Sequence, residues 1–146
     1  MADYPVTLSD DRITPIASQE TAQTGFTHKF KIKYTDIPAT ATGATDTVTF
    51  TLGTTPTYYN IDKALVVVRT AFAGTTALAA GVGTSSSVAT ISASQSVLTA
   101  TALSGAAGNV PANKVQGSAA INLVSVFTNA TGGSPSACTA GELDIY

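Results

Sequence analysis

The sequence predicts an all-β protein: an antiparallel β-sandwich or jelly roll with an extended N-terminal arm. Several short segments alternate apolar and polar residues with a period of two, glycine- and proline-containing turns separate them, and helical periodicity is scarce. The 146 residues suffice for one domain with a real core. We therefore expect an extended arm over residues 1–26 and a β-sandwich domain over residues 27–146.

The arm is predicted because nothing in it favours a helix. Pro5 and Pro15 interrupt any helix, and residues 17–25 show no apolar periodicity. Such an arm either moves freely or is held by a partner. Apolar side chains would serve no purpose in a freely moving tail, so we expect four of them to contact a neighbouring subunit or another partner: Val6, Leu8, Ile13 and Ile16.

Two amphipathic strands are predicted in the middle of the chain. Residues 28–34 alternate three apolar side chains, among them Ile32, with three lysines, which gives one dry face and one wet face. Residues 47–52 repeat this design with threonines on the wet face. The polar loop 38–45 is suited to join them as two antiparallel strands.

Three further strands are predicted towards the C-terminus. Residues 61–72 include a β-branched run, Leu65–Val68, that is apolar on both faces and therefore favours a central strand. Residues 120–127 and 142–146 form two more strands, separated by a glycine- and proline-containing turn at 131–135.

The stretch between these strands has low complexity and gives weaker signals. Short strands are predicted at 78–82 and 88–91, and a short helix at 94–103, where a serine could cap the first turn. A structureless loop of this length would be unusual in a compact domain, which favours partial strand character.

Charge is scarce and unevenly distributed. Charged residues make up 11% of the chain, against about 25% in ordinary globular proteins, and the formal net charge is −2. From Thr70 to Gly141 the only charged side chain is Lys114. The balance argues against binding to nucleic acid or anionic lipid. A large surface of hydroxyls and small side chains is instead typical of a surface that neighbouring chains cover, because interface cores are depleted of charge.

No pattern of catalytic or metal-binding residues is found. His28 is the only histidine and Cys138 the only cysteine, and no nucleophile motif or phosphate-binding loop accompanies them. The carboxylate pairs Asp10–Asp11 and Glu142/Asp144 fit solvated acids better than ligands, although a calcium ion shared between subunits stays open. We expect no enzyme activity, catalytic residue, cofactor, metal or small-molecule substrate.

Two adjacent tyrosines, Tyr58 and Tyr59, follow Pro56 in a turn. They are predicted to pack against the sheet or a partner, since basic residues do not surround them.

The sequence shows no membrane span and no export signal. No apolar run approaches the ~20 residues of a membrane span, and the acidic N-terminus is unlike a secretory signal. We therefore expect no membrane partner and synthesis in the cytoplasm without export.

Three sections of the chain together resemble proteins from structural gene clusters of tailed bacteriophages: DTVTFTLG (Asp46–Gly53), ALVVVRTAFAGTTALAAGVG within Lys63–Gly83, and the Gly-Gly-Ser-Pro turn leading to ELDIY within Ala119–Tyr146. The resemblance implies a capsid decoration (cement) protein. Such proteins commonly form β-sandwich or jelly-roll trimers, often with an extended arm, that sit over junctions between major capsid subunits. The implied partner is the major capsid protein, the implied state a homotrimer, and the implied location the capsid surface of the virion.

Two other non-enzymatic functions stay open. The chain could be a tail, neck or fibre component of the same kind of particle. It could also be a carbohydrate-binding adhesion β-sandwich, although the absence of tryptophan counts against a sugar site.

Overall fold

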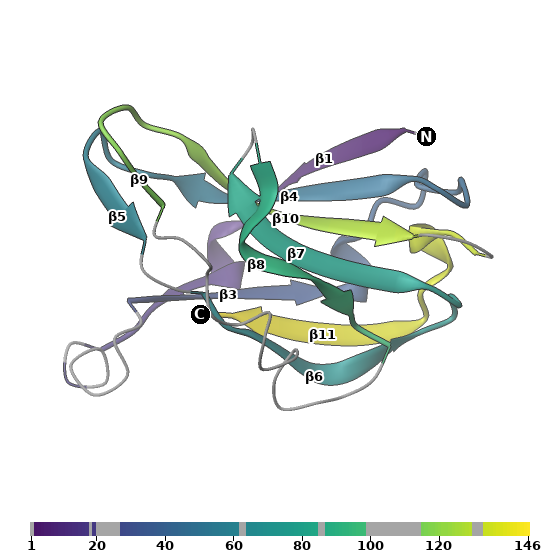
Figure 1. Cartoon of the computed structure of the whole chain (residues 1–146). Coiled ribbons are helices and arrows are strands. Elements are labelled where there is room, and N and C mark those ends of the chain that lie inside the picture. Colours follow the sequence, from purple (N-terminus) through teal and green to yellow (C-terminus); the bar gives the residue numbers. More distant parts are fainter. Residues whose placement is uncertain are drawn as a thin grey trace.

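The computed structural model describes residues 2–17, 19, 27–61, 64–84, 87–98, 115–129 and 133–146. These residues form two β-sheets that pack face to face, with a small ribbon at one end (Figure 1). The strands are β1 (Asp3–Thr7), β2 (Ile13–Pro15), β3 (His28–Lys33), β4 (Thr47–Thr54), β5 (Tyr59–Ile61), β6 (Val66–Ala73), β7 (Leu78–Thr84), β8 (Ser87–Ser96), β9 (Val115–Gly117), β10 (Asn122–Asn129) and β11 (Ala140–Ile145). Three single-turn 3₁₀ helices accompany them: η1 (Asp10–Arg12), η2 (Tyr34–Asp36) and η3 (Pro135–Ala137).

The strand order defines an all-β sandwich, as the sequence predicts. One sheet has five strands in the order β1-β4-β10-β7-β8, and the other has four in the order β2-β3-β11-β6. Every pairing is antiparallel except that of β1 with β4, which is parallel. The ribbon pairs β5 with β9.

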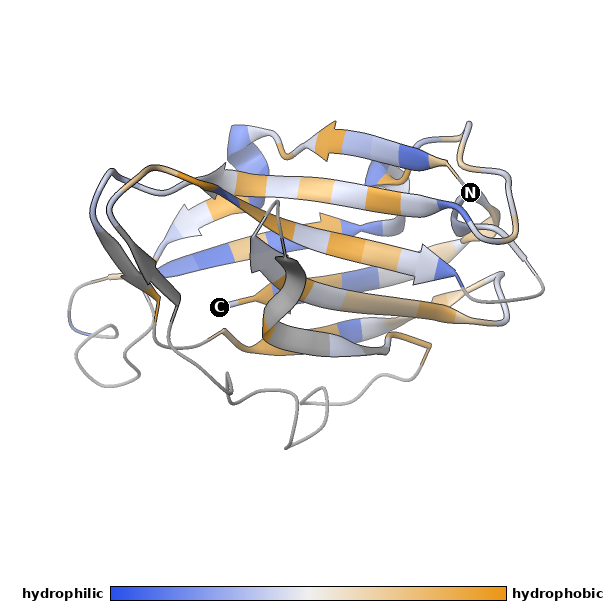
Figure 2. Cartoon of the chain, turned by 45° about the horizontal axis from the view of Figure 1, so that its top comes forward, coloured by the Kyte–Doolittle hydropathy of each residue, from blue (hydrophilic) through white to orange (hydrophobic). Residues whose placement is uncertain are grey.

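The core lies between the two sheets, where alternate side chains of each strand point inward. The alternation is visible along the five-stranded sheet in Figure 2, where apolar and polar residues follow one another. Phe127 of β10 lies edge to face against Phe50 of β4 and Phe72 of β6, with ring centroids 5.2 Å and 5.5 Å apart. Because Phe72 belongs to the other sheet, this trio joins the two layers; such pairs add about 0.5–1.5 kcal/mol beyond burial.

The extended N-terminal arm is not confirmed. Residues 3–7 form β1 on the edge of the five-stranded sheet, and residues 13–15 form β2 on the edge of the four-stranded sheet. Leu8, between them, is 6% exposed and belongs to the core. The segment that the sequence assigns to an arm over 1–26 thus packs on this chain's own sheets as far as residue 17; residues 18 and 20–26 lie outside the described part.

The loop 38–45 does not join two neighbouring strands. β3 and β4 lie in different sheets, so the connection crosses from one layer to the other. The crossing is held from inside, because Ile37 and Ala41 are buried in the core. At its end the carboxylate of Asp46 accepts the N–H of Gly43 at 2.7 Å and that of Ala2 at 3.1 Å.

Two other predictions are also wrong. The strand predicted as central, β6, lies at the edge of its sheet. Beside it lies Val97, whose backbone carbonyl accepts the N–H of Phe72 at 3.0 Å and whose N–H donates to the carbonyl of Leu78 at 3.0 Å. The helix predicted at 94–103 is excluded over its first residues, because β8 continues to Ser96 and pairs with β7. Residues 99–103 lie outside the described part.

Candidate functional site

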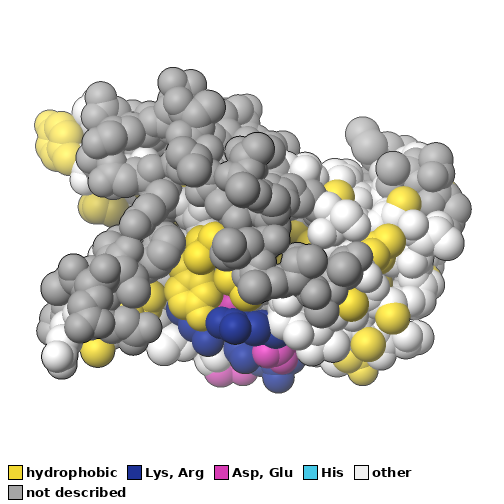
Figure 3. All heavy atoms as spheres, turned by 60° about the horizontal axis from the view of Figure 1, so that its bottom comes forward, with side chains coloured by type: hydrophobic (Ala, Val, Ile, Leu, Met, Phe, Trp, Pro, Cys, Tyr) yellow, Lys and Arg dark blue, Asp and Glu magenta, His cyan; other side chains and the backbone are white. Residues whose placement is uncertain are grey.

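The outward side of the four-stranded sheet concentrates charged side chains, and we call it the charged face. Figure 3 shows basic and acidic side chains gathered there in one patch. The lysines of β3 form the wet face that the sequence predicts, and the structure places β11 beside them, with Lys31 opposite Asp144 and Lys33 opposite Glu142. The charged face comprises Lys29, Lys31, Lys33, Arg69, Glu142 and Asp144.

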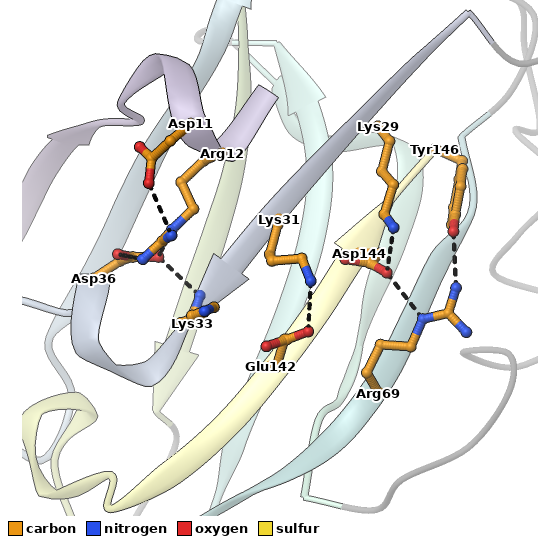
Figure 4. Close-up of polar contacts among 10 residues, drawn as sticks. All are labelled: Asp11, Arg12, Lys29, Lys31, Lys33, Asp36, Arg69, Glu142, Asp144 and Tyr146. Atoms are coloured by element: carbon orange, nitrogen blue, oxygen red, sulfur yellow. Dashed lines mark hydrogen bonds and ion pairs between the residues drawn. The ribbon is translucent and has the colours of Figure 1, made fainter. Parts of the chain in front are cut away.

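The ion pairs of this face run diagonally, not directly across (Figure 4). Lys31 Nζ lies 2.8 Å from Glu142 Oε1, and Lys29 Nζ lies 3.2 Å from Asp144 Oδ2. Diagonal neighbours in a sheet are within reach of long side chains. The hydrogen bond to Glu142 raises the pKa of Lys31. The consequence is that the last lysine, Lys33, has no carboxylate at ion-pair distance among the described residues.

Asp144 is the buried centre of the face. The residue is 1% exposed, and its Oδ2 also accepts a hydrogen bond from Arg69 Nε at 2.9 Å. Arg69 in turn donates to the hydroxyl of Tyr146 at 2.8 Å, and these two bonds, the one to Asp144 first, raise the arginine pKa. Two cations therefore offset the cost of burying one carboxylate. Its other oxygen, Oδ1, is buried and has no hydrogen-bond partner within the described part of the chain.

A second cluster ties the N-terminal segment to the charged face. Arg12 of η1 makes a two-pronged contact with Asp36 of η2, with Nε–Oδ2 at 3.0 Å and the second nitrogen–Oδ1 at 2.9 Å. Its remaining terminal nitrogen donates to Asp11 at 3.2 Å. The hydrogen bonds that Arg12 donates to Asp36 raise the pKa of the arginine. Asp36 also accepts the backbone N–H of Lys33 at 2.8 Å, which fixes the turn that ends β3.

A pocket of about 440 Å³ opens where these two clusters meet. It brings together side chains from η1, the end of β3, η2, β6 and β11, which are distant in sequence. Its lining residues are Arg12, Lys33, Tyr34, Thr35, Thr70, Ala140, Gly141 and Glu142. Gly141 has φ +144°, and a Cβ there would lie 2.4 Å from the ring of Phe72, so the chain needs glycine at this wall.

The outward side of the five-stranded sheet differs in chemistry, and we call it the neutral face. It is defined by the residues that alternate with the inward Val48 and Phe50 along β4 and by the partners of those residues in the strand registers. Asp3 carries the only charge on the outward sides of β1, β4, β7 and β10, and its Oδ1 accepts the hydroxyls of Thr47 at 2.9 Å and Thr49 at 2.7 Å. The neutral face comprises Asp3, Pro5, Thr7, Thr47, Thr49, Thr51, Ala79, Val124, Val126 and Thr128.

The predicted partner residues are not brought together. Leu8 is buried in the core, and Val6 is half-buried and packed against it. The other residues predicted to contact a partner lie apart from these two, on other edges of the fold. Ile13 pairs with Phe30, Ile16 donates its N–H to Thr27 at 3.0 Å, Tyr58 is 78% exposed, and Tyr59 lies in β5 with its side chain outside the described part.

Sequence reasoning missed the pocket and found only part of the charged face. The alternating lysines of β3 were a sufficient signal for the wet side of that strand. Nothing local relates Arg12 or Thr70 to Lys33, because η1 and β6 reach the same place only through sheet pairing.

The described residues offer no strong sign of catalysis or metal binding. His28 is exposed, and its Nδ1 lies 2.9 Å from the hydroxyl of Thr27. Burial raises the pKa of the Cys138 thiol, which disfavours a nucleophilic thiolate. Within the described ranges, no group of three or more His, Cys, Asp or Glu residues is placed to hold a metal, and no helix has the length and hydropathy to cross a membrane.

Comparisons with known proteins add no relative to this picture. No family model, no curated protein and no solved structure matches the chain.

Proposed function

We propose that the chain is a non-enzymatic structural protein of a tailed-phage virion, which decorates and stabilises the capsid by bridging major capsid subunits. The observation that supports this proposal is the separation of charge between the two faces of the sandwich. One face concentrates ion pairs, whereas the other is built from hydroxyls and small or apolar side chains.

The exposed margin of the neutral face, on β1 and β4, suits burial in an assembly; Val124 and Val126 on β10 are already buried within the chain. Solvated surfaces of soluble domains normally mix both signs of charge, whereas interface cores are depleted of charge. Pro5 and Thr7 on β1 are exposed and Thr51 on β4 is half-buried, so this margin of the face is available to a neighbour. The single carboxylate at the margin, Asp3, already accepts two threonine hydroxyls, which reduces the cost of covering it.

A bridging protein stabilises a shell by mass action. Each contact with an assembled capsid favours the assembled state over free subunits, and a trimer multiplies weak contacts into high avidity. Tyr58 adds an exposed aromatic ring at the ribbon end of the sandwich, of the residue type that anchors many interfaces.

The experiment is co-sedimentation of the purified chain with capsids that lack it. Deleting residues 1–20 is a poor test, because the deletion removes β1 and the core residue Leu8. The test variant is instead the pair Thr7→Lys and Thr51→Lys, which lie side by side on the neutral face. The matched control is Thr139→Lys, which places the same side chain at an exposed position before β11. We expect the pair to lose binding and the control to keep it; equal binding by both would contradict the proposal.

Location and oligomeric state are tested separately. Antibody labelling of virions whose genome encodes the chain should mark the whole capsid shell. Labelling confined to the tail, neck or fibres would replace the capsid proposal by that alternative, and absence of the chain from the particles would overturn both. The native mass is expected to be that of a trimer.

A further inference from the structure

Lys33 is a cation at a pocket, and none of the described carboxylates lies at ion-pair distance from it. The diagonal pairing joins Lys31 to Glu142 and Lys29 to Asp144, and so it uses both carboxylates of β11 on the first two lysines of β3. Asp36, the next acid along the chain, is bonded to Arg12 and accepts only the backbone N–H of Lys33. The ammonium of Lys33 therefore lines the pocket with no compensating carboxylate at ion-pair distance among the described residues.

The other walls offer groups that can both donate and accept hydrogen bonds. Thr35 and Thr70 are exposed, and their hydroxyls make no hydrogen bond within the described part of the chain. Glu142 uses Oε1 for Lys31, which leaves its second oxygen as an acceptor. Arg12 uses three of its five N–H groups on Asp36 and Asp11.

One side of the pocket is an aromatic ring. Tyr34 leaves the strand at η2 and is 37% exposed, the only large apolar side chain besides Tyr58 that is exposed in the described residues. The chain contains no tryptophan, so this tyrosine is the ring available for stacking at this pocket.

We propose that this pocket binds an acidic sugar, a pyranose ring that carries one carboxylate, as a unit of a glycan. The carboxylate pairs with Lys33, the sugar hydroxyls exchange hydrogen bonds with Thr35, Thr70 and Glu142, and the apolar face of the ring lies on Tyr34. A volume of about 440 Å³ falls within the roughly 300–1,000 Å³ of small-ligand sites. The inference does not depend on the capsid proposal.

An acidic peptide side chain fits the same walls less well. A lone carboxylate on an aliphatic stem would satisfy Lys33 but would leave the two threonine hydroxyls unused. It would also approach the carboxylate of Glu142 without offering it a donor, whereas a sugar hydroxyl supplies one.

The test is a titration of the isolated full chain, followed by NMR amide shifts, with galacturonic acid, N-acetylneuraminic acid and neutral galactose. We expect the acidic sugars to shift amides of residues 33–35, 70 and 140–142, and to bind at least about tenfold more tightly than galactose. Lys33→Gln should abolish the preference, Lys33→Arg should keep it, and Tyr34→Ala should weaken all three sugars. A thermal melt of each variant checks that the fold is retained.

Three results would overturn the proposal. The first is binding of galactose as tight as that of the acidic sugars, with no effect of Lys33→Gln. The second is the absence of any shift at the pocket with all three sugars. The third is displacement by a glutamate-containing peptide that binds more tightly than either acidic sugar, which would assign the pocket to an acidic protein segment.

Discussion

The ammonium of Lys31 bonds to Glu142 Oε1 at 2.8 Å, although the two residues are diagonal and not opposite in the pairing of β3 with β11. Because of this offset, Asp144 pairs with Lys29, and Lys33 at the pocket is left without an ion pair to any described carboxylate. The same carboxylate of Asp144 is then shared with Arg69 of β6, so one buried acid links three strands of the sheet. The charged face is therefore both a structural network and the wall of a candidate binding site.

Removing an ion pair from the buried part of this network should lower the free energy of unfolding more than removing one from its exposed part. Arg69→Gln leaves Asp144, which is 1% exposed, with one cation in place of two. We expect the free energy of unfolding to fall by about 2 kcal/mol. This is less than for a fully buried pair, because Arg69 itself is half-exposed. Lys31→Gln removes a half-exposed pair and should cost about 0.5 kcal/mol. Urea unfolding of both variants measures the difference; equal losses would show that Asp144 does not depend on Arg69.

The wall of the pocket gives a matched pair of glycine substitutions. Gly141→Ala combines φ +144° with a contact of 2.4 Å to the ring of Phe72, so we expect destabilisation by about 3 kcal/mol or more. Gly53→Ala, in β4, meets nothing within 4 Å and should stay within about 0.5 kcal/mol of the parent chain. Thermal unfolding of both variants checks this. An unchanged melting temperature for Gly141→Ala would contradict the positive φ and the close approach to Phe72 at this position.

The N-terminal segment should behave as part of the core. Leu8→Ala is expected to lower the free energy of unfolding by about 2–5 kcal/mol, because Leu8 is 6% exposed and packs between the sheets. Thr7→Ala, at the neighbouring exposed position, should change it by less than about 0.5 kcal/mol. If both variants unfolded at the same urea concentration, the segment would be an arm after all.

Acid should destabilise the chain partly through Asp46. Backbone hydrogen bonds, first from Gly43 and then from Ala2, lower its pKa below the ordinary 3.8. A lowered folded-state pKa stabilises the fold at pH values above 3.8, and this contribution disappears as the pH falls through the folded-state pKa. Asp46→Asn should therefore be less stable than the parent near neutral pH, and the difference in the free energy of unfolding should narrow as the pH falls below 3.8. Urea unfolding across this range tests the sign, and a gap that widened in acid would contradict it.

Local pattern predicted the strands well, because a period of two depends only on neighbouring residues. β3, β4, β10 and β11 lie where the alternation of apolar side chains places them. The same alternation is present in Tyr4, Val6 and Leu8. Pro5 argues against a helix there, but it does not exclude an edge strand, and β1 is an edge strand.

Pairing and the pocket were beyond local pattern. The sequence of loop 38–45 is typical of a hairpin connection. In the structure the loop crosses from one sheet to the other, with Ile37 and Ala41 buried in the core between them. Lys33 looks like its two neighbouring lysines in the sequence. That no described carboxylate pairs with it follows from the diagonal pairing of Lys31 with Glu142, which lies on a strand more than 100 residues away.

The central claim is that the exposed margin of the neutral face on β1 and β4 is covered in the native particle while the charged face stays in solvent. The most direct measurement is the maleimide reactivity of Thr7→Cys and Thr70→Cys, in the free chain and in the virion, since the native Cys138 is buried. The account predicts that both introduced thiols react in the free chain, and that in the particle Thr7→Cys becomes protected while Thr70→Cys stays reactive. Equal reactivity of Thr7→Cys in both settings would contradict it.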